Sequence, residues 1–290
     1  MSQKKMHRSL FFRTNMQGAV GVSAIVSRTL FKNLIIRLPV LIAGIVLIGF
    51  LSRPAMGAER MDPEADKILR SMSTFLGGLS SFSAKADIDN EIIDLDGQKL
   101  QISSSAEIVL ERPGNLYVNR QGAIAHVEFI FDGKLLTIYG RNLNVYFQMD
   151  SPGTTDTAIE TLHHEVGLDA PGADLFLTDP YTALSEGVVS SAYLGTAYVN
   201  GVECHYLTFR EAQVDWQLWI NAEGDPLPMK YIITTKWLTG APQYAVRFHD
   251  WNMAPKIKPG QFVFKAPEGA KKLEAVNVDK MGELVIEEDK

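Results

Sequence analysis

Short runs that alternate apolar and polar residues, separated by tight turns, dominate residues 82–149. In FIFDGKLLTIY (129–139), two apolar runs flank Asp132-Gly133. An Asp-Gly pair in this setting is the strongest short-range signal of a β-hairpin. Further turn signals divide the segment into expected strands at 82–92, 100–111, 115–121, 125–131, 134–139 and 144–149. Strands this short, joined by tight turns, predict an antiparallel meander.

One helical pattern precedes these strands and another follows them. At 62–79, Asp62 and Pro63 are typical of a helix start, and the apolar residues behind them recur three and four positions apart. A second helical region is expected over 154–186, because its apolar residues lie on one side of a helix. The first helix is amphipathic and must therefore pack on another element.

Strands are expected again from 188 to about 264, in the half of the chain that holds all four tryptophans. In WQLWINAEGDPLPMKYIITTK (216–236), bulky residues occupy both faces of two strands that flank a turn. A strand with one face on a core and the other in water carries bulky apolar groups on one face only. The second face must therefore contact some further part of the protein.

Together these patterns predict a mainly β (α+β) protein, in which helical segments cover one face of an antiparallel sheet. No internal repeat or low-complexity linker divides the sequence. We expect a single domain over residues 59–276, a length that all-β domains reach. The charged end of the chain, residues 277–290, is expected to be a loose tail.

The first 58 residues predict export. They contain eight Lys or Arg and no Asp or Glu, and they include the apolar run LPVLIAGIVLIGFL (38–51), followed by small residues up to Ala58. A basic stretch, a short apolar run and a small-residue end describe a secretory signal peptide. The run is shorter than the ~20 residues of a membrane-spanning helix. We expect residues 1–58 to be cleaved and the protein to be periplasmic; the alternative is an uncleaved anchor in the inner membrane.

The charge of the exported chain limits its partners. Without the leader, 20 basic and 34 acidic residues remain, which gives a net charge of −14. Such a charge repels nucleic acids and anionic membrane surfaces. We therefore expect no nucleic-acid partner, and no integral membrane span after signal cleavage. Cys204 is the single cysteine, so it cannot form an intrachain disulfide, and we expect it to be buried as a small apolar residue.

The sequence contains no recognised catalytic motif and no metal or cofactor motif. In His163-His164-Glu165, adjacent helical positions point about 100° apart, so the two histidines cannot ligate one metal together. Asp87 and Asp89 share a strand face with Lys85, which favours a water-facing surface over a calcium or acid–base site. We therefore expect no enzymatic activity, no metal and no cofactor.

The surplus of apolar residues leaves two interpretations of the covered sheet face. The helical segments could fill that face as plain core, which patterning alone favours. Alternatively, sheet and helices could enclose a cleft that admits an acyl chain, since ligand cavities are lined mainly by apolar and aromatic groups.

The order of several motifs resembles an uncharacterised family of predicted secreted bacterial proteins related to the outer-membrane lipoprotein carrier superfamily. The matching segments are FDGKLLTIYGRNLNVYFQM (131–149), TLHHEVGLDAPGADLFLTDP (161–180), VDWQLWINAEGDPLPMKYIITTK (214–236), FHDWN (248–252) and FVFKAPEGA (262–270). The resemblance implies a half-open antiparallel β-barrel, with its concave face covered by the N-terminal helix and a central helical insertion. It also implies that an arginine gates the helical cover, but the sequence assigns no residue to that role.

The resemblance further implies a non-enzymatic periplasmic carrier that holds a hydrophobic ligand, either a lipid or a lipoprotein acyl chain. Some relatives instead sense envelope stress by binding proteins, so an interaction module for an envelope protein is the alternative. We expect Trp216, Leu218 and Tyr231 on the concave face and Trp219 and Ile232 on the convex face, although the faces could be exchanged. The candidate ligand-binding residues are Ile88, Ile108, Leu110, Phe129, Phe131, Trp216, Leu218 and Tyr231. The ligand itself and the oligomeric state stay open.

Overall fold

The computed structural model describes residues 61–166, 170–278 and 283–285, all within one compact unit. The expected signal peptide, residues 1–58, lies outside the described residues. Helix α1 (Pro63–Gly78) comes first, followed by β1 (Ser81–Ile93), β2 (Lys99–Glu111), β3 (Asn115–Gly122), β4 (His126–Phe131), β5 (Leu135–Gly140) and β6 (Val145–Asp150). The helical insertion then comprises α2 (Thr155–Glu165), the 3-10 helix η1 (Ala173–Phe176) and α3 (Pro180–Ser185).

The second group of strands is β7 (Ser190–Val199), β8 (Val202–Arg210), β9 (Val214–Asn221), β10 (Pro228–Thr235) and β11 (Gln243–Asn252). Three very short strands follow: β12 (Lys271–Leu273), β13 (Asn277–Val278) and β14 (Leu284–Val285). No helix within the described ranges is long and apolar enough to cross a membrane.

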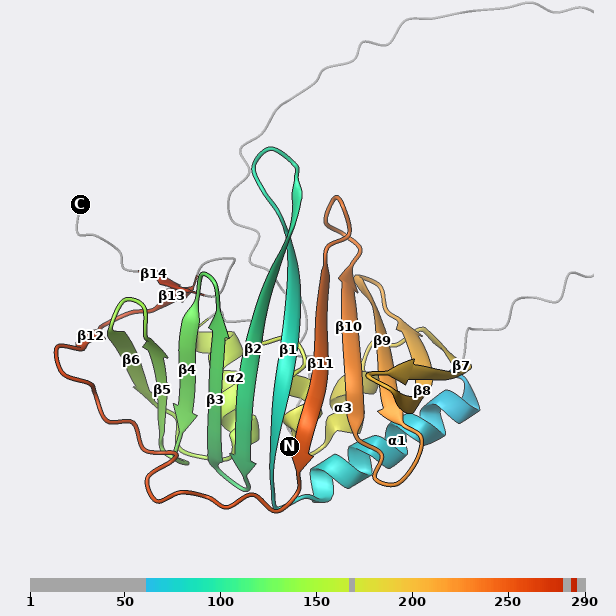
Figure 1. Ribbon diagram of the computed structural model, residues 1–290, viewed down its shortest axis with the longest axis horizontal. Helices are drawn as coiled ribbons and strands as arrows, with labels where there is room; N and C mark the ends of the chain where they lie inside the picture. The colour runs from blue at the N-terminus through green and yellow to red at the C-terminus, as the bar shows by residue number, and fades with distance from the viewer. Residues whose placement is uncertain (1–60, 167–169, 279–282, 286–290) are drawn as a thin grey trace, which may run out of the picture. The chain divides into compact units, whose positions relative to one another are not determined.

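Twelve strands form one curved sheet in the order β12-β6-β5-β4-β3-β2-β1-β11-β10-β9-β8-β7 (Figure 1). Strand β12 pairs with β6 in parallel, and the other neighbours in this sheet are antiparallel. The pairing of β1 with β11 joins the two meanders, with Ala86 opposite Phe248 and Ile88 opposite Val246. The sheet stays open, because its outermost strands β12 and β7 do not pair with each other. The predicted fold class is confirmed.

The helices cover one face of this sheet. In Figure 1, α2 and α3 lie behind the strands. Buried residues of α1 and α2, including Leu69 and Leu162, share one hydrophobic cluster with Phe82, Leu110 and Phe131 of the sheet. This cluster is the main core, and we call the sheet face that it covers the concave face.

Helix α1 has the predicted start. The side chain of Asp62 accepts hydrogen bonds from the backbone N–H groups of Glu64 (2.9 Å) and Ala65 (3.1 Å), and Pro63 occupies the first helical position. These contacts satisfy donors that would otherwise lack partners at the helix N-terminus. The buried stripe of the helix then runs through Ala65, Ile68, Leu69, Met72 and Leu76, at spacings of one, three and four residues.

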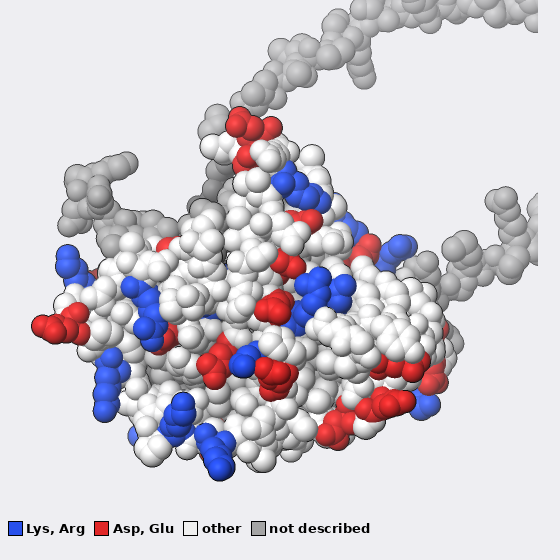
Figure 2. Space-filling model, viewed as in Figure 1, with Lys and Arg blue, Asp and Glu red and all other residues white. Residues whose placement is uncertain are grey.

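The opposite, convex face of the sheet is charged, as its alternation predicts. Asp89 pairs with Arg247 at 3.1 Å, and Lys85 pairs with Asp250 at 3.0 Å. Figure 2 shows positive and negative side chains interspersed over this face, with neither sign dominating it. Within the described part of the chain, no group of acidic, histidine and cysteine residues could hold a metal ion.

The bulky residues on both faces of β9 and β10 have two different environments. Trp216 and Tyr231 belong to the main core, whereas Trp219 packs in a small second cluster with Val199 and Cys204. Tyr206 stacks on Trp219 with ring centroids 4.4 Å apart. The second face is therefore covered by side chains of neighbouring strands rather than by another layer.

Two expectations about the C-terminal part are wrong. Strands do not continue to residue 264: β11 ends at Asn252, and Phe264 lies in irregular chain, packed against Tyr139 (5.4 Å) and Tyr146 (5.0 Å). The apolar residues of FVF (262–264) resemble a strand pattern, but the contacts of Phe264 with Tyr139 and Tyr146 hold this irregular segment against β5 and β6. The tail is not uniformly loose either, since β13 pairs with β14 and Leu284 is only 2% exposed.

The core packing predicts a contrast between two leucines. Leu69 on α1 is 0% exposed, whereas Leu95 between β1 and β2 is fully exposed. Leu69→Ala should lower the free energy of unfolding by about 2–5 kcal/mol, because it removes buried methyl groups and leaves a cavity. Leu95→Ala should change it by no more than about 0.5 kcal/mol. Urea unfolding measures both, and equal effects would contradict this assignment of the core.

Candidate functional site

A cavity of about 190 Å³ lies between the concave face of the sheet and the helical insertion. Strands β1, β2, β3, β4 and β11 form its floor, and α2, η1 and the chain before η1 form its roof. On the sheet side, Ile108, Val118 and Phe129 line it, and on the insertion side Ile159, Leu162 and Phe176 do so. It is therefore bounded mainly by apolar groups, as ligand cavities typically are.

The hollow follows from two small residues in the floor. Ala86 of β1 and Ala106 of β2 are direct register partners, are almost fully buried and line the cavity together. In the next row along the strands, Ile108 faces Val118 across β2 and β3. Because the alanine row is shallower than the isoleucine–valine row, space is left beneath the helical insertion.

The eight predicted ligand-binding residues all lie on the concave side, but they do not form one site. Ile88, Ile108 and Phe129 line the cavity. Trp216 and Tyr231 line a second, much smaller space. The remaining three are buried in the main core and line neither space: Leu110, Phe131 and Leu218. Ligand contact by any of the eight stays a prediction.

The alanine floor and the contribution of β11 to the cavity were not predicted from the sequence. The alternation Phe82-Ala84-Ala86-Ile88 carries a signal, since two small residues inside an apolar face leave room above them. Tyr244, Val246 and Phe248 carried no comparable signal. They reach the cavity only because β11 pairs with β1, about 160 residues earlier in the chain.

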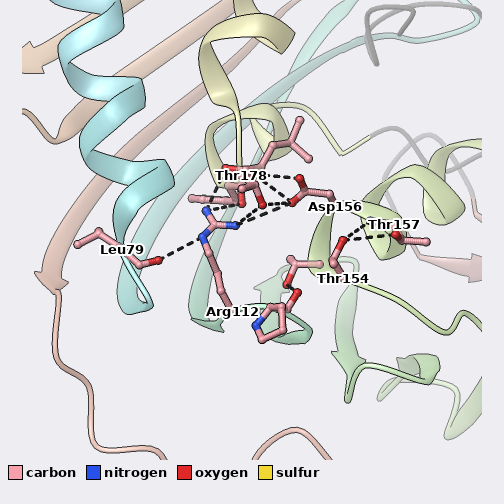
Figure 3. A network of polar contacts seen from close by, with 10 residues as sticks. Leu79, Arg112, Thr154, Asp156, Thr157 and Thr178 are labelled. Atoms are coloured by element: carbon pink, nitrogen blue, oxygen red, sulfur yellow. Dashed lines mark hydrogen bonds and ion pairs between the residues drawn. The ribbon is translucent and has the colours of Figure 1, made fainter. Parts of the chain in front are cut away.

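Arg112, directly after β2, connects the sheet to both helical parts (Figure 3). Its guanidinium donates hydrogen bonds to the backbone oxygens of Leu79 (3.2 Å), Phe176 (3.0 Å) and Leu177 (2.9 Å). Its Nη1 also donates to the hydroxyl of Thr178 (3.3 Å). Burial lowers the pKa of this guanidinium, but arginine keeps its charge at any physiological pH. Arg112 therefore fastens the insertion to the edge of the core.

Two neighbours complete this fastening. The Asp156 carboxylate of α2 accepts hydrogen bonds from the backbone N–H (3.0 Å) and hydroxyl (3.1 Å) of Thr178, and lies 3.8 Å from Arg112. At Gly77, near the end of α1, a Cβ atom would overlap the carbonyl oxygen of Thr178. The absence of a side chain there lets α1 and the insertion approach closely.

A buried acidic group lies under the same insertion. Asp174 of η1 is 2% exposed, and its Oδ1 has no hydrogen-bond partner among the described residues. It lines a space of about 10 Å³ with Glu211, Trp216 and Tyr231, and Trp216 Nε1 donates to Glu211 Oε1 at 2.8 Å. Burial, reinforced by the Glu211 carboxylate, raises the pKa of Asp174 well above its ordinary 3.8. Burial also raises the pKa of Glu211.

The raised pKa of Asp174 predicts a pH dependence of stability. The folded state holds a proton that the unfolded state releases above about 3.8, so its stability should fall as pH rises from there toward the raised pKa. Asp174→Asn, which cannot ionise, should flatten this decline and be the more stable protein near neutral pH. Urea unfolding of both proteins at several pH values between about 4 and 8 measures how the free energy of unfolding depends on pH. Parallel curves for the two proteins would contradict the assignment.

The Arg112 contacts predict local opening when they are lost. Arg112→Ala removes hydrogen bonds from a charged donor, each worth about 1.5–3 kcal/mol. Amide exchange in residues 173–178 should therefore quicken roughly tenfold or more, whereas β4 and β5 should change less. Arg210→Ala, at a 61% exposed side chain, is the matched control. Unchanged exchange in Arg112→Ala would show that the insertion is held by other contacts.

Several known structures are similar to this chain, each at low sequence identity and a TM-score below 0.5. An uncharacterised conserved protein from Thermus thermophilus is 11% identical, with a TM-score of 0.44 over 72% of this chain and 98% of the other. The lipoprotein LppX of Mycobacterium tuberculosis is 16% identical, with a TM-score of 0.42 over 68% and 100%. A LolA superfamily protein from Nitrosomonas europaea is 10% identical, with a TM-score of 0.35 over 69% and 97%. The likeness in each case is one of fold alone.

No curated protein matches the chain. The family model described as "Predicted periplasmic protein (DUF2092)" matches residues 65–276, which include most of α1, the cavity and the helical insertion. The chain therefore belongs to the DUF2092 family of predicted periplasmic proteins.

Proposed function

We propose that this protein is a non-enzymatic periplasmic carrier that holds a hydrophobic ligand, a lipid or a lipoprotein acyl chain, between its concave sheet and its helical insertion. The observation that carries the proposal is the apolar cavity of about 190 Å³ beneath a segment held by localised polar contacts. Hydrophobic burial supplies affinity without a reactive group, at roughly 0.8 kcal/mol per CH₂.

The size of the cavity indicates how a long chain would enter. An apolar cavity of about 150 Å³ admits a benzene molecule, so the space here suffices for part of a ligand. Pockets for whole drug-sized ligands measure roughly 300–1,000 Å³. A complete acyl chain therefore requires the insertion to move outward. Arg112 and Asp156 are the polar groups that this movement would release, since they join the sheet, α1 and the insertion.

A second function, binding of an envelope protein without a small ligand, is favoured by the outer edge of the sheet at β7. Among the described strands, β7 pairs only with β8. The backbone N–H of Asp62 donates to the hydroxyl of Ser191 at 2.8 Å, whereas Leu194 (55%) and Tyr198 (71%) are exposed. An unpaired edge offers backbone N–H and C=O groups to an added strand. The bulge near Gly195 interrupts this edge, so the cavity remains the better-supported site.

Filling the alanine floor tests the carrier proposal. Ala106→Leu places a larger side chain in the cavity and should reduce uptake of a fluorescent fatty acid at least tenfold, while thermal unfolding shows that the fold persists. Ala254→Leu adds the same side chain at an exposed position and should bind like the wild type.

A second experiment uses the unmodified protein, purified from the periplasm without detergent. Native mass spectrometry should show the mass of a protein–lipid complex, and extraction with organic solvent should release the lipid. A clean apo mass and no uptake of added fatty acid or phospholipid would refute the carrier proposal in favour of protein binding.

A further inference from the structure

Exposed apolar side chains gather at one edge of the sheet. Because the strands from β1 to β11 pair antiparallel, the β1–β2, β3–β4, β5–β6 and β10–β11 turns lie at the same edge, together with the start of β7. Of the nine exposed large apolar side chains in the described part of the chain, six lie there. We call this the apolar edge, and its six residues are Leu95, Ile124, Leu143, Val189, Trp237 and Leu238.

The turns at the opposite edge of the sheet are polar. They join β2 to β3, β4 to β5, β7 to β8 and β9 to β10, and none of these four described turns exposes a large apolar side chain. Two of them contain Asp132-Gly133 and Asn200-Gly201, which are residue pairs typical of tight turns. Turn geometry therefore does not explain why the first edge carries apolar residues.

Two hairpins of the apolar edge form a joint projection. At the top of Figure 1, the β1–β2 and β10–β11 hairpins extend beyond the neighbouring strands. They lie side by side because β1 pairs with β11, and the Glu91 carboxylate accepts a hydrogen bond from the backbone N–H of Gln243 at 2.9 Å. Leu95 at one tip is therefore held next to Trp237 and Leu238 at the other.

The charges of these two tips do not favour an anionic partner. The Asp94 carboxylate accepts hydrogen bonds from the backbone N–H groups of Asp96 (3.0 Å) and Gln98 (2.7 Å), and so stabilises its own turn. Lys236 of the other turn lies 2.8 Å from Asp215. Proteins that bind anionic lipids by charge use clusters of Lys and Arg, which neither turn contains. Attraction to a partner must therefore come from the apolar groups.

The helical insertion is fastened at the opposite edge. Arg112, in the β2–β3 turn, donates hydrogen bonds to the backbone oxygens of Phe176 and Leu177. The backbone N–H of Thr155, at the start of α2, donates to the carbonyl of Pro113 in the same turn at 2.8 Å. Because these polar contacts lie at the polar edge, a chain that leaves the cavity without breaking them moves toward the apolar edge.

We propose that the apolar edge docks on the surface of a lipid bilayer with zwitterionic headgroups, and that Leu95, Trp237 and Leu238 enter its headgroup region. Tryptophan is favoured at membrane–water interfaces, because its ring is apolar and its N–H is polar. The inference rests on the proposed carrier function and adds the surface from which the carrier takes its ligand.

The spacing of the tips favours a bilayer over a folded partner. Neighbouring tips lie two strand spacings apart, which is roughly 10 Å, with polar turn residues between them. A stable protein interface buries about 800 Å² on each partner around a close-packed apolar centre. Lipids fill the gaps between separate tips, whereas a folded partner needs a matching surface.

Sedimentation with sucrose-loaded vesicles tests the docking surface. The wild type should bind phosphatidylcholine vesicles, and its affinity for phosphatidylglycerol vesicles should be about fivefold lower at low salt, because the exported chain is acidic. Added salt should narrow that difference.

Variants identify the residues that dock. Leu95→Ser combined with Trp237→Ser should lower affinity for phosphatidylcholine vesicles about tenfold or more, because it removes apolar surface that the bilayer buries. Leu194→Ser combined with Tyr198→Ser also removes one leucine and one aromatic residue from exposed positions, and should bind vesicles like the wild type. Neither Leu95 nor Trp237 lines the cavity, so the first variant should take up a fluorescent fatty acid from solution as the wild type does. Circular dichroism confirms that both variants are folded.

The outcomes separate the docking surface from the carrier function. Undiminished vesicle binding by the Leu95→Ser/Trp237→Ser variant, or no wild-type binding to either vesicle while fatty-acid uptake persists, would overturn the docking surface and leave the carrier function standing. A wild-type dimer that the same variant dissociates in sedimentation velocity would identify a second copy of the chain as the occupant, and would also overturn it. If the wild type takes up no fatty acid, the carrier function is wrong, whereas loss of vesicle binding in the first variant alone would still support docking.

Discussion

The antiparallel pairing of β1 with β11 is the contact on which the rest of the structure depends. Without it, the chain would form two separate meanders, β1 to β6 and β7 to β11, each with a short sheet. With it, Ala86 lies opposite Phe248 and Ile88 opposite Val246, so residues from both halves line one cavity. The price is loop-closure entropy over about 160 residues, which grows only slowly with loop length.

The cavity is a consequence of side-chain size in an otherwise well-packed face. Large residues such as Phe82, Leu110 and Phe131 fill the main core, where Phe82 packs against Phe176 of η1 (5.7 Å). Further along the same strands, alanines at 86 and 106 stop short of α2. Interiors are normally close-packed, and a void forfeits the dispersion contacts of its lining. A preformed void beneath an attached segment is consistent with a site whose packing is completed by a ligand.

Local patterns predicted the strands, the helix starts and the fold class, because turn chemistry, capping and alternation act over a few residues. Asp132-Gly133 and Asp62-Pro63 illustrate this, since their partners lie in the same short segment. The candidate site could be predicted less well from the sequence. Arg112 binds backbone oxygens that lie 33 to 65 residues away. Because every residue has a backbone carbonyl, the residue types at these positions do not indicate such a contact. The residues of β11 line the cavity only because β11 pairs with β1, and no local pattern encodes this pairing. Phe264 was wrongly predicted to lie in a strand, and it instead packs on β5 and β6 from irregular chain.

The insertion has one set of contacts that stabilises its position on the sheet and one buried group that destabilises it. Arg112 fixes it at one end through several charge-assisted hydrogen bonds, whereas Asp174 buries an acidic group beside another carboxyl group, Glu211. Protonation makes Asp174 tolerable in the closed form, and any ionisation of it favours a form in which the group reaches water. A ligand that fills the cavity can shift the balance between forms only by its difference in affinity for them. The proposed carrier function would require a closed form that shields the apolar floor and an open form of similar free energy that a chain can enter. The Arg112 hydrogen bonds favour the first, and the buried acid Asp174 opposes them.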